Sequence, residues 1–175
     1  MGITWLLVPG GTCQYGDEGR PVEIGSLYWA ATPVAHDDGR PLTGVNHEEA
    51  AAIAAQLGGR LPKSAEWEWM AAGPDRHTYP WGDRPWRPRL ANLRDSALGG
   101  PAPVGQHPEG ATPLGLLDVA GNVWEWTATT LMGDGAIIRG GSFASPPLYA
   151  RCTFLNAAPA ELRSRGIGFR VVREA

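Results

Sequence analysis

The sequence predicts one α+β domain in which two short helices and several short strands are joined by many loops. Three observations point to this class. The chain has 175 residues, 43% of them hydrophobic, which is enough for one core and within the usual size of one domain. Its 24 glycines and 16 prolines place turns throughout, and its 8 tryptophans can fill the space between them. Because aromatic residues recur along the chain, we expect packed loops and not disorder.

Two segments carry the signals of short helices. Asn46 precedes an acidic residue at the third helical position, Glu49, which is the pattern of a capped helix start. The helix ends at Gly58-Gly59, after one apolar face made of Ala50, Ile53, Ala54 and Leu57. A second helix begins near Ser64 and stops at Gly73-Pro74. Both are too short to be stable alone, so they must pack on a shared core.

Strand-like segments lie at residues 5–8, 22–29, 136–139 and 169–173. We expect the first and last of these to pair, which would bring the termini together. The opening MGITWLLVPGG has no basic residue before its apolar run and reaches a Pro-Gly-Gly turn too soon for a signal peptide or a membrane span. It therefore predicts an edge strand, no membrane insertion and a cytoplasmic location.

Charge and cysteine content exclude several functions. The formal net charge is -3 and the arginines are scattered, so nucleic acid is not an expected partner. The two cysteines, Cys13 and Cys152, lie far apart and neither has a CxxC partner, which argues against a zinc site or a redox motif. We expect two separate thiols instead of one disulfide.

Five motifs follow one another in a fixed order: GGRLPKSAEWEWMAAG at 58–73, YPWGD at 79–83, GLLDVAGNVWEWT at 115–127, RGGSF at 139–143 and GIGFRVVR at 166–173. In this order and spacing the chain resembles the formylglycine-generating enzyme, or sulfatase-modifying factor, family from Val8 onward. The resemblance implies a C-type-lectin-like fold over residues 1–175, with small twisted antiparallel sheets, two helices and long loops. It also implies a ligand or active site near the C-terminal part of the chain.

The motifs contain residues that we interpret as framework. In GNVWEWT the two tryptophans would bury large apolar area, and the carboxylate between them must then be paired. Asn122 is expected to support its turn by bonding its own backbone. The two arginines of RGGSF and GFRVVR would lock loops by forked hydrogen bonds to carbonyls or to Glu125. From the residues themselves the predicted framework is Trp124, Glu125, Trp126, Arg139 and Arg170. The resemblance also implies framework roles for Gly140, Gly141, Ser142, Arg151, Gly168 and Phe169.

The family's catalytic features do not carry over to this chain. Formylglycine-generating enzymes bind copper through a cysteine pair, but residues 144–150 contain no cysteine, and Cys152 could supply one ligand at most. Iron-dependent relatives need a histidine cluster, whereas the histidines here are dispersed at positions 36, 47, 77 and 107. We therefore predict no catalytic residue. A metal-dependent oxidase or oxygenase, or a regulatory binding subunit, remains the alternative.

Calcium is the one cofactor that the resemblance leaves open. Family members hold calcium with an asparagine and backbone carbonyls, and Asn92 matches that asparagine. The acidic loop that completes the site is shortened here, and Asp37-Asp38-Gly39 lacks the further acidic ligands of a calcium loop. We expect no cofactor, with Asn92 as a weak calcium candidate.

The chain most resembles a non-catalytic branch, the variable proteins of diversity-generating retroelements. That resemblance implies a diversified ligand-binding segment at residues 139–170 and a protein or other macromolecule as ligand. Residues 144–165 show no helical or strand period, which is typical of a surface loop. The alternative is that its large residues complete the core. The predicted ligand contacts are Phe143, Ala144, Ser145, Leu148, Tyr149, Phe154, Leu155, Asn156, Glu161 and Ser164.

Overall fold

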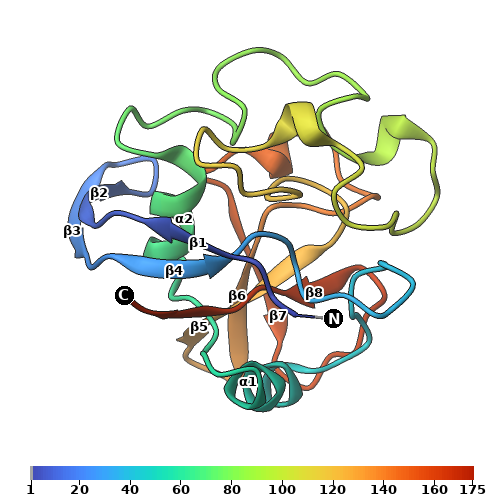
Figure 1. Ribbon diagram of the computed structural model, residues 1–175, viewed down its shortest axis with the longest axis horizontal. Helices are drawn as coiled ribbons and strands as arrows, with labels where there is room; N and C mark the ends of the chain where they lie inside the picture. Colours follow the sequence, from blue (N-terminus) through green and yellow to red (C-terminus); the bar gives the residue numbers. More distant parts are fainter. Residues whose placement is uncertain (1) are drawn as a thin grey trace.

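A computed structural model describes residues 2–175, which form two α-helices, nine short strands and three 3-10 turns (Figure 1). The strands are β1 Trp5–Val8, β2 Gly11–Tyr15, β3 Arg20–Ile24, β4 Leu27–Ala30, β5 Trp124–Leu131, β6 Gly135–Arg139, β7 Leu155–Pro159, β8 Ile167–Phe169 and β9 Val172–Glu174. The helices are α1 His47–Gln56 and α2 Ser64–Ala72, and the turns are η1 Arg94–Ser96, η2 Pro108–Gly110 and η3 Pro147–Ala150. The predicted α+β class is confirmed.

The strands form three small sheets, ordered β1-β4-β9, β2-β3 and β7-β6-β5-β8. Every strand pair is antiparallel except β5 with β8. Between α2 and β5 a long stretch of loops covers one end of the molecule, whereas α1 lies at the opposite end (Figure 1). No helix in residues 2–175 is long and apolar enough to cross a membrane.

The helix predictions are confirmed. Asn46 Oδ1 accepts the Glu49 backbone N–H at 2.9 Å, and Glu49 Oε2 accepts the Asn46 N–H at the same distance. At the start of α2, Glu66 Oε2 accepts the Lys63 N–H at 2.7 Å. Gly73 ends α2 with a φ of 66°, a backbone conformation that glycine adopts without strain.

The strand predictions were correct in place but wrong in pairing. Residues 22–29 form two strands, because the chain turns at Gly25-Ser26 and leaves the β2-β3 hairpin for the central β4. Residues 169–173 also divide, with Arg170 and Val171 between β8 and β9. The first and last strands belong to one sheet but do not pair, since β4 lies between them. As expected, β1 is an edge strand.

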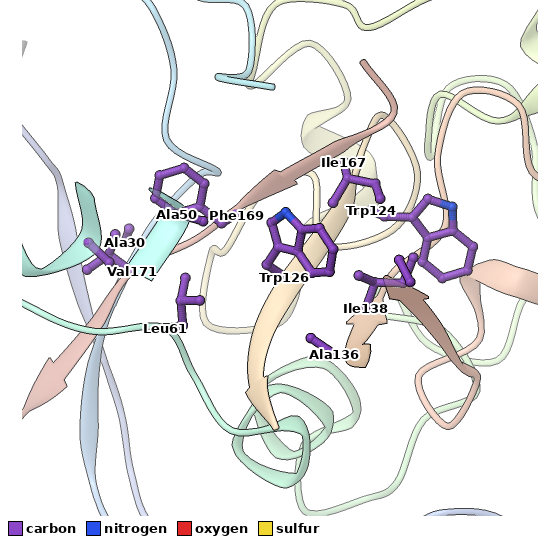
Figure 2. Close-up of a cluster of buried hydrophobic side chains, with 12 residues drawn as sticks. Ala30, Ala50, Leu61, Trp124, Trp126, Ala136, Ile138, Ile167, Phe169 and Val171 are labelled. Atoms are coloured by element: carbon purple, nitrogen blue, oxygen red, sulfur yellow. The ribbon is translucent and has the colours of Figure 1, made fainter. Parts of the chain in front are cut away.

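Two layers of core form on the opposite faces of β5. Alternation along a strand sends Trp124 and Trp126 to one face and Glu125 to the other. Figure 2 shows both indole rings in one apolar cluster with Ile138, Ile167 and Phe169. Ala50 and Ala54 of α1 complete this cluster. The Trp126 ring is fully buried and contributes at least about 2 kcal/mol by the apolar area it removes from water.

Candidate binding site

The opposite face of β5 holds a buried ion pair beneath α2. Glu125 accepts from Arg170 Nη2 at 2.9 Å and from Arg170 Nε at 3.1 and 3.2 Å. The Trp67 indole N–H of α2 donates to the same carboxylate at 2.8 Å. Arg170 also donates to the carbonyls of Ala30, Ala31 and Leu117. Because every group is paired, the burial of two charges is compensated and four segments are fixed together.

Arg139 forms a second buried cluster, although not with the glutamate that is opposite it across the strand pair. It donates to Glu68 Oε2 at 2.6 Å and to Ser64 of α2. Its Nη1 donates to the carbonyls of Cys152 and Phe154 at 3.0 Å each. One side chain thus attaches the chain between η3 and β7 to the buried helix.

Arg139 and Arg170 pair with different carboxylates, Glu68 and Glu125. Glu66 and Glu68, two positions apart on α2, face different ways, with Glu66 bound to Arg60 at 2.8 Å.

Arg151, which we predicted as framework, is exposed. The expectation for Asn122 was wrong, since its amide bonds both the N–H and the carbonyl of Ala102 instead of its own backbone. The left-handed φ of 65° at Asn122 turns its side chain toward that neighbouring loop.

The turn after Arg139 leads into the predicted binding segment. Gly140 has a φ of 95°, and a Cβ there would lie 2.6 Å from the Val119 carbonyl oxygen, so only glycine fits. Ser142, two residues further on, donates its backbone N–H to Ser145 Oγ at 2.9 Å. Ser145 is buried by this turn, so the structure places it in the framework and not among the ligand contacts.

Beyond this turn lies an open depression of about 520 Å³. Its floor is apolar and includes Trp124, Ile138 and Ile167. At the rim the Arg165 guanidinium lies over the Phe143 ring, 5.1 Å from its centroid. The remaining lining residues are Ser142, Ala144, Ala157, Ala158, Pro159, Leu162, Ser164 and Gly166. This arrangement gives an apolar surface with two hydroxyls and one cation for polar contacts.

Two further aromatic rings, those of Tyr149 and Phe154, pack against Trp124 of the floor. Tyr149 and Phe154 are stacked with centroids 4.5 Å apart, and each is tilted against Trp124 at 6.0 and 6.3 Å. Both are half-buried. They therefore extend the core and leave part of each ring exposed, and contact of these rings with a ligand stays a prediction.

The other predicted contacts do not line the depression. Leu148, Leu155 and Asn156 are exposed but lie outside the depression, whereas Glu161 lines a second open hollow beside it. Sequence reasoning missed the lining residues Ala157, Ala158, Pro159, Leu162 and Arg165. Most belong to or follow β7, where small residues gave no alternation of apolar and polar side chains.

Both cysteines are free and buried, as expected for separate thiols. Burial is the main cause that raises the pKa of Cys13 to about 11, and it raises the pKa of the Cys152 thiol still more. Neither sulfur lines the depression. Burial thus favours the neutral thiol over the thiolate, which is the form that binds a soft metal.

Asn92 offers one buried oxygen for a cation. Its Oδ1 has no hydrogen-bond partner, while its Nδ2 donates to Gly100 O at 3.0 Å and to Asn122 Oδ1 at 3.1 Å. Calcium takes six to eight oxygen ligands and prefers carboxylates among them. Within residues 2–175 no group of three or more His, Cys, Asp or Glu side chains is placed to hold a metal. Calcium binding at Asn92 therefore stays a prediction, with this oxygen as the one side-chain ligand that the residue could supply.

Comparison with known proteins identifies the family. The model of the sulfatase-modifying factor enzyme 1-like domain matches residues 20–175. The chain belongs to this family. Its fold is C-type-lectin-like, and the structure of Treponema denticola variable protein 1 superposes with a TM-score of 0.83 at 17% identity, over 99% of this chain and 95% of that one.

Curated members of the sulfatase-modifying factor family include enzymes similar to this chain. The formylglycine-generating enzyme of Mycobacterium tuberculosis is 38% identical over 168 residues, which cover 89% of this chain and 50% of the enzyme. The hercynine oxygenase of the same organism is 37% identical over 139 residues, which cover 66% of this chain and 32% of that protein. The chain thus spans between a third and a half of the length of these relatives.

Proposed function

We propose that this chain is a non-catalytic binding domain that holds a protein or another macromolecule over the depression beside β7. The chemistry of the depression's walls carries this proposal. Its polar lining groups are Ser142, Ser164 and Arg165, and no cysteine, histidine or carboxylate lines it. Such a surface can bind and orient a ligand, but it has no side chain suited to general acid or base catalysis or to holding a metal.

The framework supports a binding role physically. The buried Glu125–Arg170 and Glu68–Arg139 pairs fix the segments around the depression without using its exposed side chains. A surface that is ordered before binding loses less entropy when a ligand arrives. The part-exposed Tyr149 and Phe154 offer large contact area at small entropic cost. Exposed residues can therefore differ without disturbing the core.

A photocrosslinking experiment tests the binding surface. A benzophenone amino acid replaces Ala144, which is exposed and lines the depression. In a control chain it replaces Leu7, which is 47% exposed and lies on β1, in a different sheet from the strands that line the depression. After irradiation in the source cells we expect one discrete adduct from position 144 and none from position 7. Equal adducts at both positions, or none at either, would contradict the proposal.

The finer proposal is that the chain is the variable protein of a diversity-generating retroelement. Its fold likeness to a variable protein supports this assignment, and so does the fact that all the lining residues of the depression except Trp124 and Ile138 fall within residues 139–170. Sequencing the DNA around the gene tests it. We expect a near-copy of the codons for residues 139–170 that differs mainly at adenines, beside a reverse transcriptase. Without that copy, the retroelement assignment fails and only the binding proposal stands.

A metal-dependent oxidase or oxygenase is the second candidate, because both curated relatives named above bear the names of enzymes. Metal analysis of the purified protein separates it from a binder. Stoichiometric copper or iron that is lost in Cys152→Ser would support the oxidase. If the protein contains no stoichiometric copper or iron, and Cys152→Ser folds and binds as the native chain does, the result supports the binder. A regulatory subunit would instead co-purify stably with one enzyme.

A further inference from the structure

A second cavity, of about 400 Å³, lies away from the depression and shares no lining residue with it. It is bounded by the end of β1, the C-terminal half of α2 and the loop at residues 112–114. Val8 and Met70 are buried on its inner side, and Leu114, 48% exposed, stands at its mouth. Trp69, Asp75 and His77 supply its aromatic and ionisable lining groups.

The aromatic wall of this cavity is fixed in place. The Trp69 indole N–H donates to the Pro9 carbonyl at 2.9 Å, which sets the orientation of the ring. Gly11 of β2 packs against the same ring so closely that a Cβ there would lie 2.6 Å from it. Since the ring is held from two sides, the cavity is already formed before any ligand enters.

A carboxylate at the rim lacks a partner. Asp75 is exposed and makes no ion pair among residues 2–175. The adjacent cation, Arg76, is turned away, because its Nη2 donates to the Gly16 carbonyl at 2.5 Å. The cavity's histidine, His77, has its Nδ1 3.6 Å from Asp83 Oδ2 and so faces a second carboxylate. Asp75 is the one carboxylate that lines the cavity, and no lysine or arginine lines it, so the charge of the lining favours a cation.

We propose that this cavity binds a small organic cation with an apolar body, such as an aromatic amine. The apolar walls would bury the body of the ligand, the Trp69 ring would attract the cation through its π face, and Asp75 would pair with it. A volume of about 400 Å³ falls at the small end of the usual range for ligand cavities. This site is independent of the binding surface proposed above.

Three ligands that share a phenyl ring test the charge preference. The titrants are 2-phenylethylamine, neutral 2-phenylethanol and anionic phenylacetate, each followed by amide NMR shifts of the complete chain. We expect the amine to bind at least three-fold more tightly than the alcohol, with phenylacetate weakest and the largest shifts around Trp69 and Met70. Equal affinities, or shifts centred elsewhere, would overturn the proposal.

Two exposed positions supply variants that should fold normally. Asp75→Asn should abolish the preference for the amine over the alcohol, and Leu114→Lys should weaken the amine at least five-fold by placing a cation at the mouth. Leu98→Lys adds the same charge at an equally exposed position outside the cavity and should bind as the native chain does. If Leu98→Lys and Leu114→Lys weaken binding equally, the amine is held by surface charge and the site is wrong.

Discussion

Single residues show how this small domain tolerates charge in its interior. Glu125 and Arg170 are almost fully buried, yet each carboxylate oxygen and most guanidinium N–H groups have partners. The cost of removing both charges from water is offset by these hydrogen bonds only while the set is complete. A carboxylate between two tryptophans in the sequence is therefore a structural group, directed to the opposite face from the rings.

Removal of one charge from this pair should be strongly destabilising. We expect Glu125→Gln to lower the free energy of unfolding by about 3–5 kcal/mol, because Arg170 is then buried without a counterion. Urea unfolding followed by tryptophan fluorescence measures the loss. Arg163→Gln, which breaks an exposed pair with Glu49, is the control and should leave the midpoint nearly unchanged. Similar losses in both variants would contradict this account.

The buried carboxyl of Asp118 should make the free energy of unfolding depend on pH. Burial is the main cause that raises the pKa of its carboxyl, so the folded state disfavours the ionised form. Its backbone also has a left-handed φ of 52°, which asparagine tolerates well. Asp118→Asn should therefore stabilise the protein at pH 7 by roughly 0.5–2 kcal/mol. The free energy of unfolding, measured from pH 7 to 4, is the test.

The sign of this effect follows from linkage. A raised pKa means that the folded carboxyl takes up its proton at higher pH than the unfolded one, so native stability falls as pH rises through the folded pKa. The advantage of Asp118→Asn should thus be greatest at neutral pH and shrink as the pH falls to about 4. An advantage that grows on acidification would show that the native carboxylate is favoured when ionised.

At the scale of elements, turns decide where each short strand can go. Gly140 redirects the chain after β6 beneath Val119, and the Arg139 side chain before it fixes the segment that leads to β7. The sequence of β7 has no pattern typical of a strand, since its residues are mostly small and exposed. It forms because β6 offers an unpaired edge in register with it.

A pair of glycine variants separates backbone strain from a steric clash. Gly133 and Gly140 have similar φ values, 91° and 95°, but a Cβ at Gly133 would meet nothing within 4 Å. Gly133→Ala should therefore cost only the strain of its backbone, about 1–2 kcal/mol. Gly140→Ala should cost clearly more or prevent accumulation of folded protein. Thermal unfolding of both compares them, and equal losses would refute a role for close packing against Val119.

For the whole molecule, the buried ion pairs and the depression lie on different faces of β5. The buried pairs and α2 lie on one face, whereas the depression opens next to Trp124 on the other. The exposed side chains of Leu148, Leu155 and Glu161 make no ion pair or side-chain hydrogen bond with the rest of residues 2–175. Changes at these side chains should thus leave the core as it is.

This separation predicts unequal effects on stability. A triple variant at exposed positions, Leu148→Ser, Leu155→Ser and Glu161→Ser, should shift the melting temperature by no more than about 3 °C. Phe154→Ala alone should lower it further, because its ring stacks on Tyr149 and packs against Trp124. Calorimetry of both variants tests this order. A larger loss in the triple variant would place those side chains in the core.

The sequence by itself determined the α+β class, both helices with their ends, and the need to pair Glu125. These follow from local signals, since a capping asparagine, a terminating glycine and a buried carboxylate have the same consequences in any fold. Tertiary structure alone decided that Arg139 binds Glu68, that Ser145 is buried and that β4 separates the terminal strands. It also decided which residues line the depression. Such features depend on pairing and packing between segments far apart in the chain, for which a strand of small residues such as β7 leaves no local pattern.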